Sequence, residues 1–287
     1  MRIASNKVKD IIDFAYKELD TIYENNEIRT MIHTLIEHFT GFSLTKILSE
    51  KNSLRVSESE LLKINFAIKD LKKEKPLQQI IGYQDFLDVR IKITPHVLIP
   101  RVETEEITQR IIKENKYKPK LKIADLCSGS GCISIGLKKA LPQADIYSYE
   151  YSQEAIKTSQ DNALLNSTPI NIIHTNLLED NTKDQNYDII VSNPPYVRES
   201  EKALMKNNVL CYEPSLALFV SDEDPLIFYK KILDFCERNL RKNGILYIEI
   251  NEFLAKETEL IYKNKGYETS VYKDLRGKDR LITAKKV

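Results

Sequence analysis

An alternation of short apolar runs with helical periodicity begins near residue 100 and leaves few folds open to this chain. Strand–helix units repeated in this way predict an α/β fold, in which helices cover both faces of a parallel sheet. The last two predicted strands have no helix between them, which predicts an antiparallel edge. We expect strands near 122–126, 146–150, 170–174, 187–192, 244–250, 269–272 and 280–285, and helices near 103–115, 132–141, 153–166, 225–241 and 252–265.

Residues 1–75 differ in composition from the rest of the chain. None of the 10 prolines lies in this segment, and Gly41 is its only glycine. Apolar residues recur there at helical spacing, and Ser57 followed by Glu60 is typical of a capped helix start. We therefore predict a helical N-terminal domain over residues 1–75.

Between the helical segment and the α/β region, the pattern changes to that of short strands. Apolar residues alternate between Gly82 and Ile93, which predicts a β-hairpin. We therefore expect a linker with a β-hairpin over residues 76–97 and the α/β domain over residues 98–287.

Length, charge and cysteine content exclude several classes of protein. The 287 residues carry 43 basic and 42 acidic side chains, and no apolar run approaches the roughly 20 residues that span a bilayer. Residues 1–75 hold 13 basic and 12 acidic side chains, against 30 and 30 in the remainder, so neither part has the basic excess of a nucleic-acid-binding protein. The chain begins without a signal-peptide core, and its four cysteines form no Cys-x-x-Cys pair. We expect a reduced, cytoplasmic protein without disulfides or a metal site.

A loop of small residues follows the first strand of the α/β domain. Residues 127–131 read Cys-Ser-Gly-Ser-Gly, and a helical pattern starts at Cys132. Such a loop lets a ligand approach the backbone and the positive end of the helix. A dinucleotide-binding loop would need a third glycine where Ser134 stands, and a P-loop would need Gly-Lys-Ser/Thr, which is absent. Both phosphate-binding interpretations are therefore disfavoured.

The second strand of this domain ends at Glu150, 21 residues after Gly129. A carboxylate at that place can accept hydrogen bonds from both ribose hydroxyls of an adenosine cofactor. The loop and the acid together favour S-adenosylmethionine, because they suit adenosine without requiring a pyrophosphate. Other Rossmann-like cofactors, and a plain surface carboxylate, stay open at this point.

The fourth strand delivers Asn193-Pro194-Pro195-Tyr196 to its carboxyl end, where open α/β sheets bind ligands. A planar amide or nucleobase nitrogen is a poor nucleophile, because its lone pair is delocalised. The Asn193 side-chain oxygen and the Pro194 carbonyl can accept its two N–H groups and aim the lone pair at a sulfonium methyl. Tyr196 can stack on the planar group. The alternative is an ordinary structural turn.

Nearly thirty residues separate Tyr196 from the next predicted helix. Connections of that length in a compact domain are usually functional. We expect a substrate-facing lid, with a flexible insertion as the alternative. Cys211, which lies in this connection, and Cys236 have no activating partner in the sequence pattern and are interpreted as small apolar residues.

Together these segments resemble the family of peptide chain release factor glutamine N5-methyltransferases, and the resemblance covers nearly all of the chain. The tetrad alone would also suit DNA adenine N6- and guanine N2-methyltransferases, so residues 76–82 and 98–105 discriminate. The segments that carry the resemblance are PLQQIIG at 76–82, LIPRVETE at 98–105, the loop at 125–131, VSNPPY at 191–196 and YEPSLAL at 212–218.

The resemblance implies a fold, a reaction and a partner. The fold is a helical domain for release factor recognition, joined by a β-hairpin to a seven-stranded, Rossmann-like class I S-adenosylmethionine-dependent methyltransferase domain. The reaction, which serves translation termination, is protein methylation at the glutamine of the Gly-Gly-Gln motif of release factors. S-adenosyl-L-methionine donates the methyl group to the side-chain amide nitrogen and leaves S-adenosyl-L-homocysteine. No direct nucleic acid contact, no membrane and a monomer are expected.

The resemblance also implies roles for individual residues. Catalytic roles fall to Asn193, Pro194 and Tyr196. The same three residues would bind the substrate with Pro195, Arg101 and Thr104; for Arg101 and Thr104, and for the neighbouring Glu103, an ordinary helix start is the alternative. The residues implied to hold the cofactor are Cys127, Ser128, Gly129, Ser130, Gly131, Glu150, Asn176, Leu177 and Asn193.

Three positions depart from the family's pattern. Cys127 stands where a glycine is usual, Val102 where a proline is usual and Asn176 where an acid is common. These departures bear on single contacts rather than on the class. Two other functions stay open. One is a nucleobase amino-methyltransferase, which would need a basic face. The other is a non-enzymatic module whose helical domain recruits a translation factor.

Overall fold

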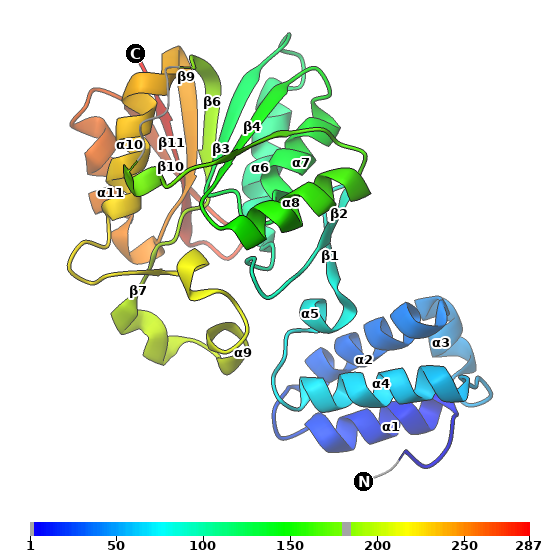
Figure 1. Cartoon of the computed structure of the whole chain (residues 1–287). Coiled ribbons are helices and arrows are strands. Elements are labelled where there is room, and N and C mark those ends of the chain that lie inside the picture. The colour runs from blue at the N-terminus through cyan, green and yellow to red at the C-terminus, as the bar shows by residue number, and fades with distance from the viewer. Residues whose placement is uncertain (1–2, 180–184) are drawn as a thin grey trace. The chain divides into compact units, whose positions relative to one another are not determined.

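The computed structural model describes residues 3–179 and 185–287, which form two compact units (Figure 1). The first unit comprises the chain up to Gly82 together with Asn207–Tyr212, and the second comprises Tyr83–Lys206 and Glu213–Val287. The first two residues of the predicted helical domain lie outside the described residues. None of the described helices combines the length and apolar character that a membrane crossing requires.

The first unit is a bundle of helices. Apolar side chains at helical spacing form its core, in which Ile11, Ile32 and Ile64 are fully buried. The expected capping box is present: Ser57 accepts a hydrogen bond from the Glu60 N–H, and the Glu60 carboxylate accepts one from the Ser57 N–H. The helices are α1 (Val8–Leu19), α2 (Asn25–Thr40), α3 (Leu44–Glu50), α4 (Glu58–Leu71) and α5 (Leu77–Ile81).

A short segment from the second half of the chain completes this unit. Asn207–Tyr212, which contains α9 (Asn207–Leu210), packs on the end of the bundle. The Tyr212 hydroxyl donates to the Lys73 carbonyl at 2.8 Å, and the Tyr212 carbonyl accepts from Gln79 Nε2 at 2.7 Å. Part of the connection expected to form a lid on the α/β domain therefore belongs to the helical unit.

A seven-stranded sheet forms the centre of the second unit (Figure 1). Its strands are β3 (Lys122–Leu126), β4 (Asp145–Glu150), β5 (Asn171–His174), β6 (Tyr187–Ser192), β9 (Leu240–Glu249), β10 (Glu268–Lys273) and β11 (Asp279–Lys285). Their order is β10-β11-β9-β6-β3-β4-β5. The neighbours from β9 to β5 are parallel, and β11 is antiparallel to both β9 and β10. The predicted parallel sheet with an antiparallel edge is confirmed.

Helices cover both faces of this sheet (Figure 1). Successive side chains of a strand point to opposite faces, so Ile123 packs into the core with α6 and α7, whereas Ala124 packs into the core with α10 and α11. Because both faces are buried, the central strands read as continuous apolar runs. The helices are α6 (Val102–Asn115), α7 (Cys132–Ala140), α8 (Gln153–Leu165), α10 (Ile227–Asn239) and α11 (Ala255–Lys263).

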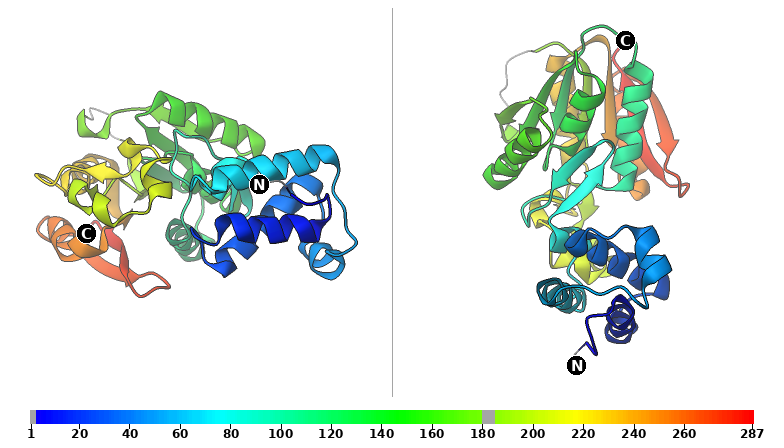
Figure 2. Two further views of the ribbon diagram at one scale, coloured as in Figure 1. Left: turned by 90° about the horizontal axis from the view of Figure 1, so that it is seen from below. Right: turned by 90° about the vertical axis from the view of Figure 1, so that its right-hand side faces the viewer.

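The predicted hairpin is formed by β1 (Tyr83–Phe86) and β2 (Val89–Lys92). Phe86 and Val89 are buried in the same core as α6 and α7, and β2 contacts α7 and α8 (Figure 2). The hairpin is thus packed into the second unit. The remaining short elements are η1 (Leu177–Glu179), β7 (Val197–Arg198), η2 (Glu199–Leu204), η3 (Ser215–Ala217), β8 (Phe219–Val220) and η4 (Glu252–Leu254).

Candidate active site

A cavity of about 360 Å³ lies in the second unit, at the carboxyl ends of β3, β4 and β6. This is the edge at which parallel sheets bind ligands. Most of the residues singled out from the sequence meet here. Those that line the cavity are Arg101, Thr104, Cys127, Ser128, Gly129, Ser130, Glu150, Asn176, Leu177, Asn193 and Pro195. Among the described residues, Gly131, Pro194 and Tyr196 are predicted site residues that do not line it.

The loop after β3 turns sharply through left-handed backbone conformations. Cys127, Gly129 and Gly131 have φ angles of +59°, +54° and +78°. Such angles suit glycine and strain a residue that carries a Cβ. At Gly131 there is also no room, since a Cβ would come 2.4 Å from Ser159 Oγ. Cys127 stands where the family usually has glycine, and its backbone has the conformation that glycine favours.

Asp125, at the end of β3, fixes the far side of this loop. Its Oδ2 accepts hydrogen bonds from the Ser134 backbone N–H at 3.1 Å and from the Ser134 hydroxyl at 2.7 Å. The side chain is fully buried, and burial raises the pKa of Asp125 to about 7, against the lowering effect of the Ser134 bonds. Ser134, which replaces the third glycine of a dinucleotide-binding loop, therefore ties the first turn of α7 to the strand.

Glu150 holds the same loop from the neighbouring strand. Its Oε2 accepts from the Gly129 N–H at 2.8 Å, and its Oε1 accepts from the Tyr151 and Ser152 N–H groups, both at 2.8 Å. A carboxylate has about four acceptor positions, so roughly one remains on Oε2 for a ribose hydroxyl. Accepting both ribose hydroxyls would require the Gly129 N–H to find another partner.

The cavity fits an adenosine-type cofactor in two respects. Ser128 Oγ is buried and has no hydrogen-bond partner among the described residues. A polar group of a bound ligand would supply the missing hydrogen bond. No atom lies within 4 Å of where a Cβ of Gly129 would be, so the backbone there is open to close approach. Further along the wall, Asn176 Oδ1 caps η1 by accepting from the Leu178 N–H, and Leu177 is buried.

The four thiols of the chain give a labelling prediction. Burial raises the pKa of Cys132 to about 12 and raises the pKa of Cys127 and Cys236 as well, whereas Cys211 is exposed. Because the thiolate is the reactive form, brief iodoacetamide treatment of the native protein at pH 8 should label the exposed Cys211 at least roughly tenfold faster than the buried Cys132 and Cys236. Mass spectrometry of tryptic peptides measures this, and rapid labelling of Cys236 would contradict the burial.

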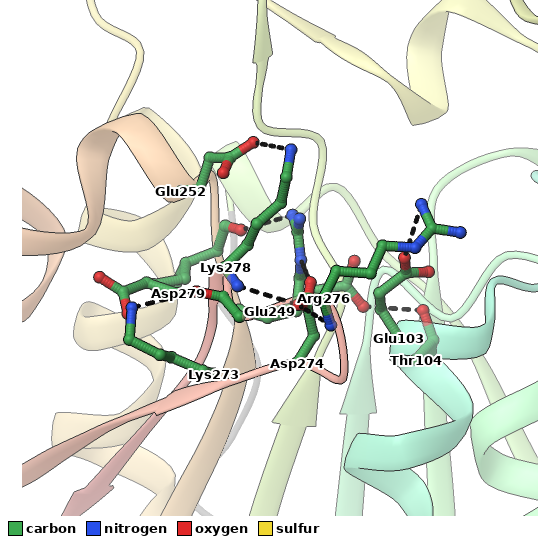
Figure 3. A network of polar contacts seen from close by, with 12 residues as sticks. Glu103, Thr104, Glu249, Glu252, Lys273, Asp274, Arg276, Lys278 and Asp279 are labelled. Atoms are coloured by element: carbon green, nitrogen blue, oxygen red, sulfur yellow. Dashed lines mark hydrogen bonds and ion pairs between the residues drawn. The ribbon is translucent and has the colours of Figure 1, made fainter.

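Asn193 is held by a chain of hydrogen bonds behind the cavity wall. Its Nδ2 donates to Thr104 Oγ1 at 3.1 Å. The Thr104 hydroxyl in turn donates to Glu249 Oε2 at 2.7 Å (Figure 3). The Tyr196 hydroxyl donates to the other Glu249 oxygen at 3.0 Å. One carboxylate at the end of β9 is therefore connected to both ends of the Asn-Pro-Pro-Tyr turn, directly to Tyr196 and through Thr104 to Asn193. Pro194, within the turn, is buried.

Glu249 was not among the residues selected from the sequence. It is 2 % exposed and follows the apolar run at residues 245–248 of β9, the strand next to β6 in the sheet. An acid closing a buried parallel strand is the same signal that singled out Glu150, so the rule applied to every strand would have found it.

A second buried carboxylate joins two walls of the cavity. Glu213 accepts from the Ile99 N–H at 3.1 Å and forms an ion pair with Arg101. The segment after it contributes Pro214, Leu216 and Ala217 to the lining. Glu103, by contrast, does not line the cavity within the described residues, and its carboxylate lies 3.8 Å from Arg276 (Figure 3).

Comparisons with known proteins show the family and the fold to which this chain is similar. The Methyltransferase small domain family matches residues 103–212. A release factor glutamine methyltransferase of Flavobacterium psychrophilum is 42% identical over 92% of this chain and 94% of its own length, and one of Bacteroides thetaiotaomicron is 37% identical over 96% and 98%. A methyltransferase structure from Pyrococcus furiosus is 14% identical and superposes with a TM-score of 0.52, covering 80% of this chain and 99% of that one.

The sheet order, the loop after β3 and the cavity beside it define a class I S-adenosylmethionine-dependent methyltransferase with a Rossmann-like fold. The match along nearly the whole chain narrows this class. The chain belongs to the release factor glutamine methyltransferase family, as the resemblance predicted.

Proposed function

We propose that this protein transfers a methyl group from S-adenosyl-L-methionine to the side-chain amide nitrogen, N5, of the glutamine in the Gly-Gly-Gln motif of peptide chain release factors. Membership of the family supports this substrate. The observation that carries the proposal is that Asn193 lines the same cavity as Gly129 and Glu150. A residue suited to gripping an amide is thereby brought beside a loop suited to adenosine.

The cofactor side of the cavity follows from the loop geometry. Bound S-adenosyl-L-methionine supplies an electrophilic methyl group on a sulfonium and leaves as S-adenosyl-L-homocysteine. The open backbone at Gly129 and the Ser128 hydroxyl would contact it directly. The residues proposed to hold it are Cys127, Ser128, Gly129, Ser130, Glu150, Asn176, Leu177 and Asn193, with Gly131 shaping the loop.

On the substrate side, hydrogen-bond acceptors would bind and orient the substrate amide. Asn193 Oδ1 and the Pro194 carbonyl would accept the two N–H groups of the substrate amide and point its lone pair at the methyl carbon. Transfer forms an N–C bond, breaks an S–C bond and releases one proton from the nitrogen. The aromatic ring of Tyr196, whose hydroxyl is fixed by Glu249, would pack against the amide plane at the edge of the cavity, which Tyr196 itself does not line. The adjoining wall of the cavity is formed by Pro195, Arg101 and Thr104.

We further propose a cytoplasmic monomer that does not contact nucleic acid directly. A cytoplasmic location follows from the substrate, because release factors act on ribosomes. The net charge of +1 supports the absence of a phosphate-binding face. Light scattering tests whether the protein is a monomer, and the salt dependence of turnover tests whether it contacts nucleic acid.

The function is tested with purified protein, release factor and cofactor labelled in its methyl group. We expect label on the release factor peptide that contains Gly-Gly-Gln, and none on a release factor changed to Gly-Gly-Ala. Labelling of the Gly-Gly-Ala protein would refute the site assignment. RNA and DNA are assayed in parallel, and turnover on either that exceeds turnover on release factor would favour a nucleobase amino-methyltransferase instead.

A further inference from the structure

We propose that Glu249 is a positioning residue that sets which way the Asn193 amide faces, and that it acts through Thr104. The proposal rests on the proposed function and adds a residue to it. Asn193 must present its oxygen to the substrate, because the substrate nitrogen carries only donors. A flipped Asn193 would present its own NH₂ group and repel the substrate.

The orientation of the Asn193 amide follows from counting the donors and acceptors along the chain of hydrogen bonds. A carboxylate only accepts, so the Thr104 hydroxyl must donate its one proton to Glu249 at 2.7 Å. The Thr104 oxygen then has only lone pairs to offer Asn193, and it accepts from Nδ2 at 3.1 Å. Oδ1 is therefore the Asn193 atom that stays available to accept a hydrogen bond from the substrate. If Thr104 were free to donate to Asn193 Oδ1, the flipped amide would be equally well bonded.

The surroundings of Glu249 favour this role. Both carboxylate oxygens receive a hydroxyl, from Thr104 and from Tyr196. Burial raises the pKa of Glu249, while these two hydrogen bonds and the positive charge of Arg280 favour the ionised form. Arg280 is itself held by Asp274 at 3.2 Å and by the Ile250 carbonyl at 3.3 Å. A buried carboxylate without hydrogen-bond or charged partners would strongly destabilise the fold, so these contacts are needed to keep Glu249 ionised.

The contrast between Glu249 and its surface neighbours is visible in Figure 3. Glu252 pairs with Lys278 at 2.7 Å, and Lys273 pairs with Asp279 at 2.9 Å. These are partly exposed pairs, which contribute little. Glu249 instead accepts from the Thr104 hydroxyl and is only 2 % exposed.

The test uses three variants and a matched control. Thr104→Val keeps the shape of the side chain and removes the hydroxyl, whereas Thr104→Ser keeps the hydroxyl. Glu249→Met removes both acceptor oxygens at similar length, and replacing a buried charge by an apolar group is often tolerated by the fold. Glu252→Met is the same substitution at a surface pair three residues away.

We expect Thr104→Val and Glu249→Met each to lower kcat about tenfold, the scale of one hydrogen bond. The KM for S-adenosyl-L-methionine should stay unchanged. Thr104→Ser, which retains the hydroxyl, should recover most of the kcat that Thr104→Val loses, and the surface control Glu252→Met should keep wild-type kcat. The Thr104→Val, Glu249→Met double variant should lose little more than the worse single variant, because the two residues act in series. Effects that multiply in the double variant, or a fully active Thr104→Val, would overturn the proposal.

A second measurement needs no substrate and so separates this proposal from the proposed function. In ¹⁵N-labelled protein, the Asn193 side-chain NH₂ signals are identified by their loss in Asn193→Ala. One proton should exchange slowly in wild type and in Thr104→Ser, and faster in Thr104→Val and Glu249→Met. Unchanged exchange in Glu249→Met would refute the positioning role, whereas an inactive wild type with the expected exchange pattern would refute only the proposed function.

Discussion

Replacing Asn193 by alanine is expected to lower kcat by about 10²–10³-fold, the scale seen when one hydrogen-bonding group that acts in the transition state is removed. The side chain lines the cavity, and its oxygen is the acceptor that would hold the substrate amide. Affinity for S-adenosyl-L-methionine should be largely kept, because the loop and Glu150 are untouched. Turnover on release factor and isothermal titration with the cofactor measure the two effects separately.

The control for this variant is Asn264→Ala. Asn264 is exposed and caps the end of α11, remote in sequence from the loop and the tetrad. The Asn264→Ala variant should leave both turnover and cofactor affinity unchanged. If cofactor affinity fell together with turnover in Asn193→Ala, Asn193 would be chiefly a cofactor-binding or folding residue.

Gly131→Ala should destabilise the second unit by at least about 2 kcal/mol and weaken cofactor binding. Two effects add at this position. The φ angle of +78° strains any residue with a Cβ, and the new Cβ would come 2.4 Å from Ser159 Oγ. Ser159 is fully buried and cannot move aside easily. Denaturant unfolding followed by tyrosine fluorescence, with cofactor titration alongside, measures both consequences.

Two further variants separate strain from crowding. Gly266→Ala has a similar φ of +83° but no atom within 4 Å of the added Cβ, so it should show only the backbone strain of about 1–2 kcal/mol. Ser159→Ala removes an oxygen that has no hydrogen-bond partner among the described residues, and by itself it should be nearly neutral. In Gly131→Ala it should restore part of the lost stability. Equal losses at Gly131 and Gly266 would show that crowding is unimportant.

The α/β domain could be predicted almost entirely from local pattern. Strands buried on both faces read as unbroken apolar runs, such as Tyr187–Ser192, and amphipathic helices alternate with them. The rule that ligands bind at the carboxyl ends of parallel strands then predicts that Cys127, Glu150 and Asn193 meet at one edge of the sheet. All three line the cavity.

What could not be predicted depends on contacts between distant residues. α3 and α5 have 7 and 5 residues, too few to show a helical period. Asn207–Tyr212 looked like part of a lid, because nothing in its own pattern says that it packs on the helical unit. Glu249 acts on Thr104 and Tyr196, which lie 145 and 53 positions away along the chain. Separations of that size leave no periodic trace.

The chain of hydrogen bonds behind Asn193 bears on how such enzymes are recognised in genomes. The orientation of the Asn193 amide depends on three segments of the chain, which contain Thr104, Asn193 and Glu249. A motif search for the tetrad examines only one of them. A relative could retain Asn-Pro-Pro-Tyr and yet have lost the acid that ends β9 or the hydroxyl in the first turn of α6. Positions 104, 193 and 249 should therefore change together during evolution, and a paralogue in which only the tetrad survives is a candidate for altered or lost chemistry.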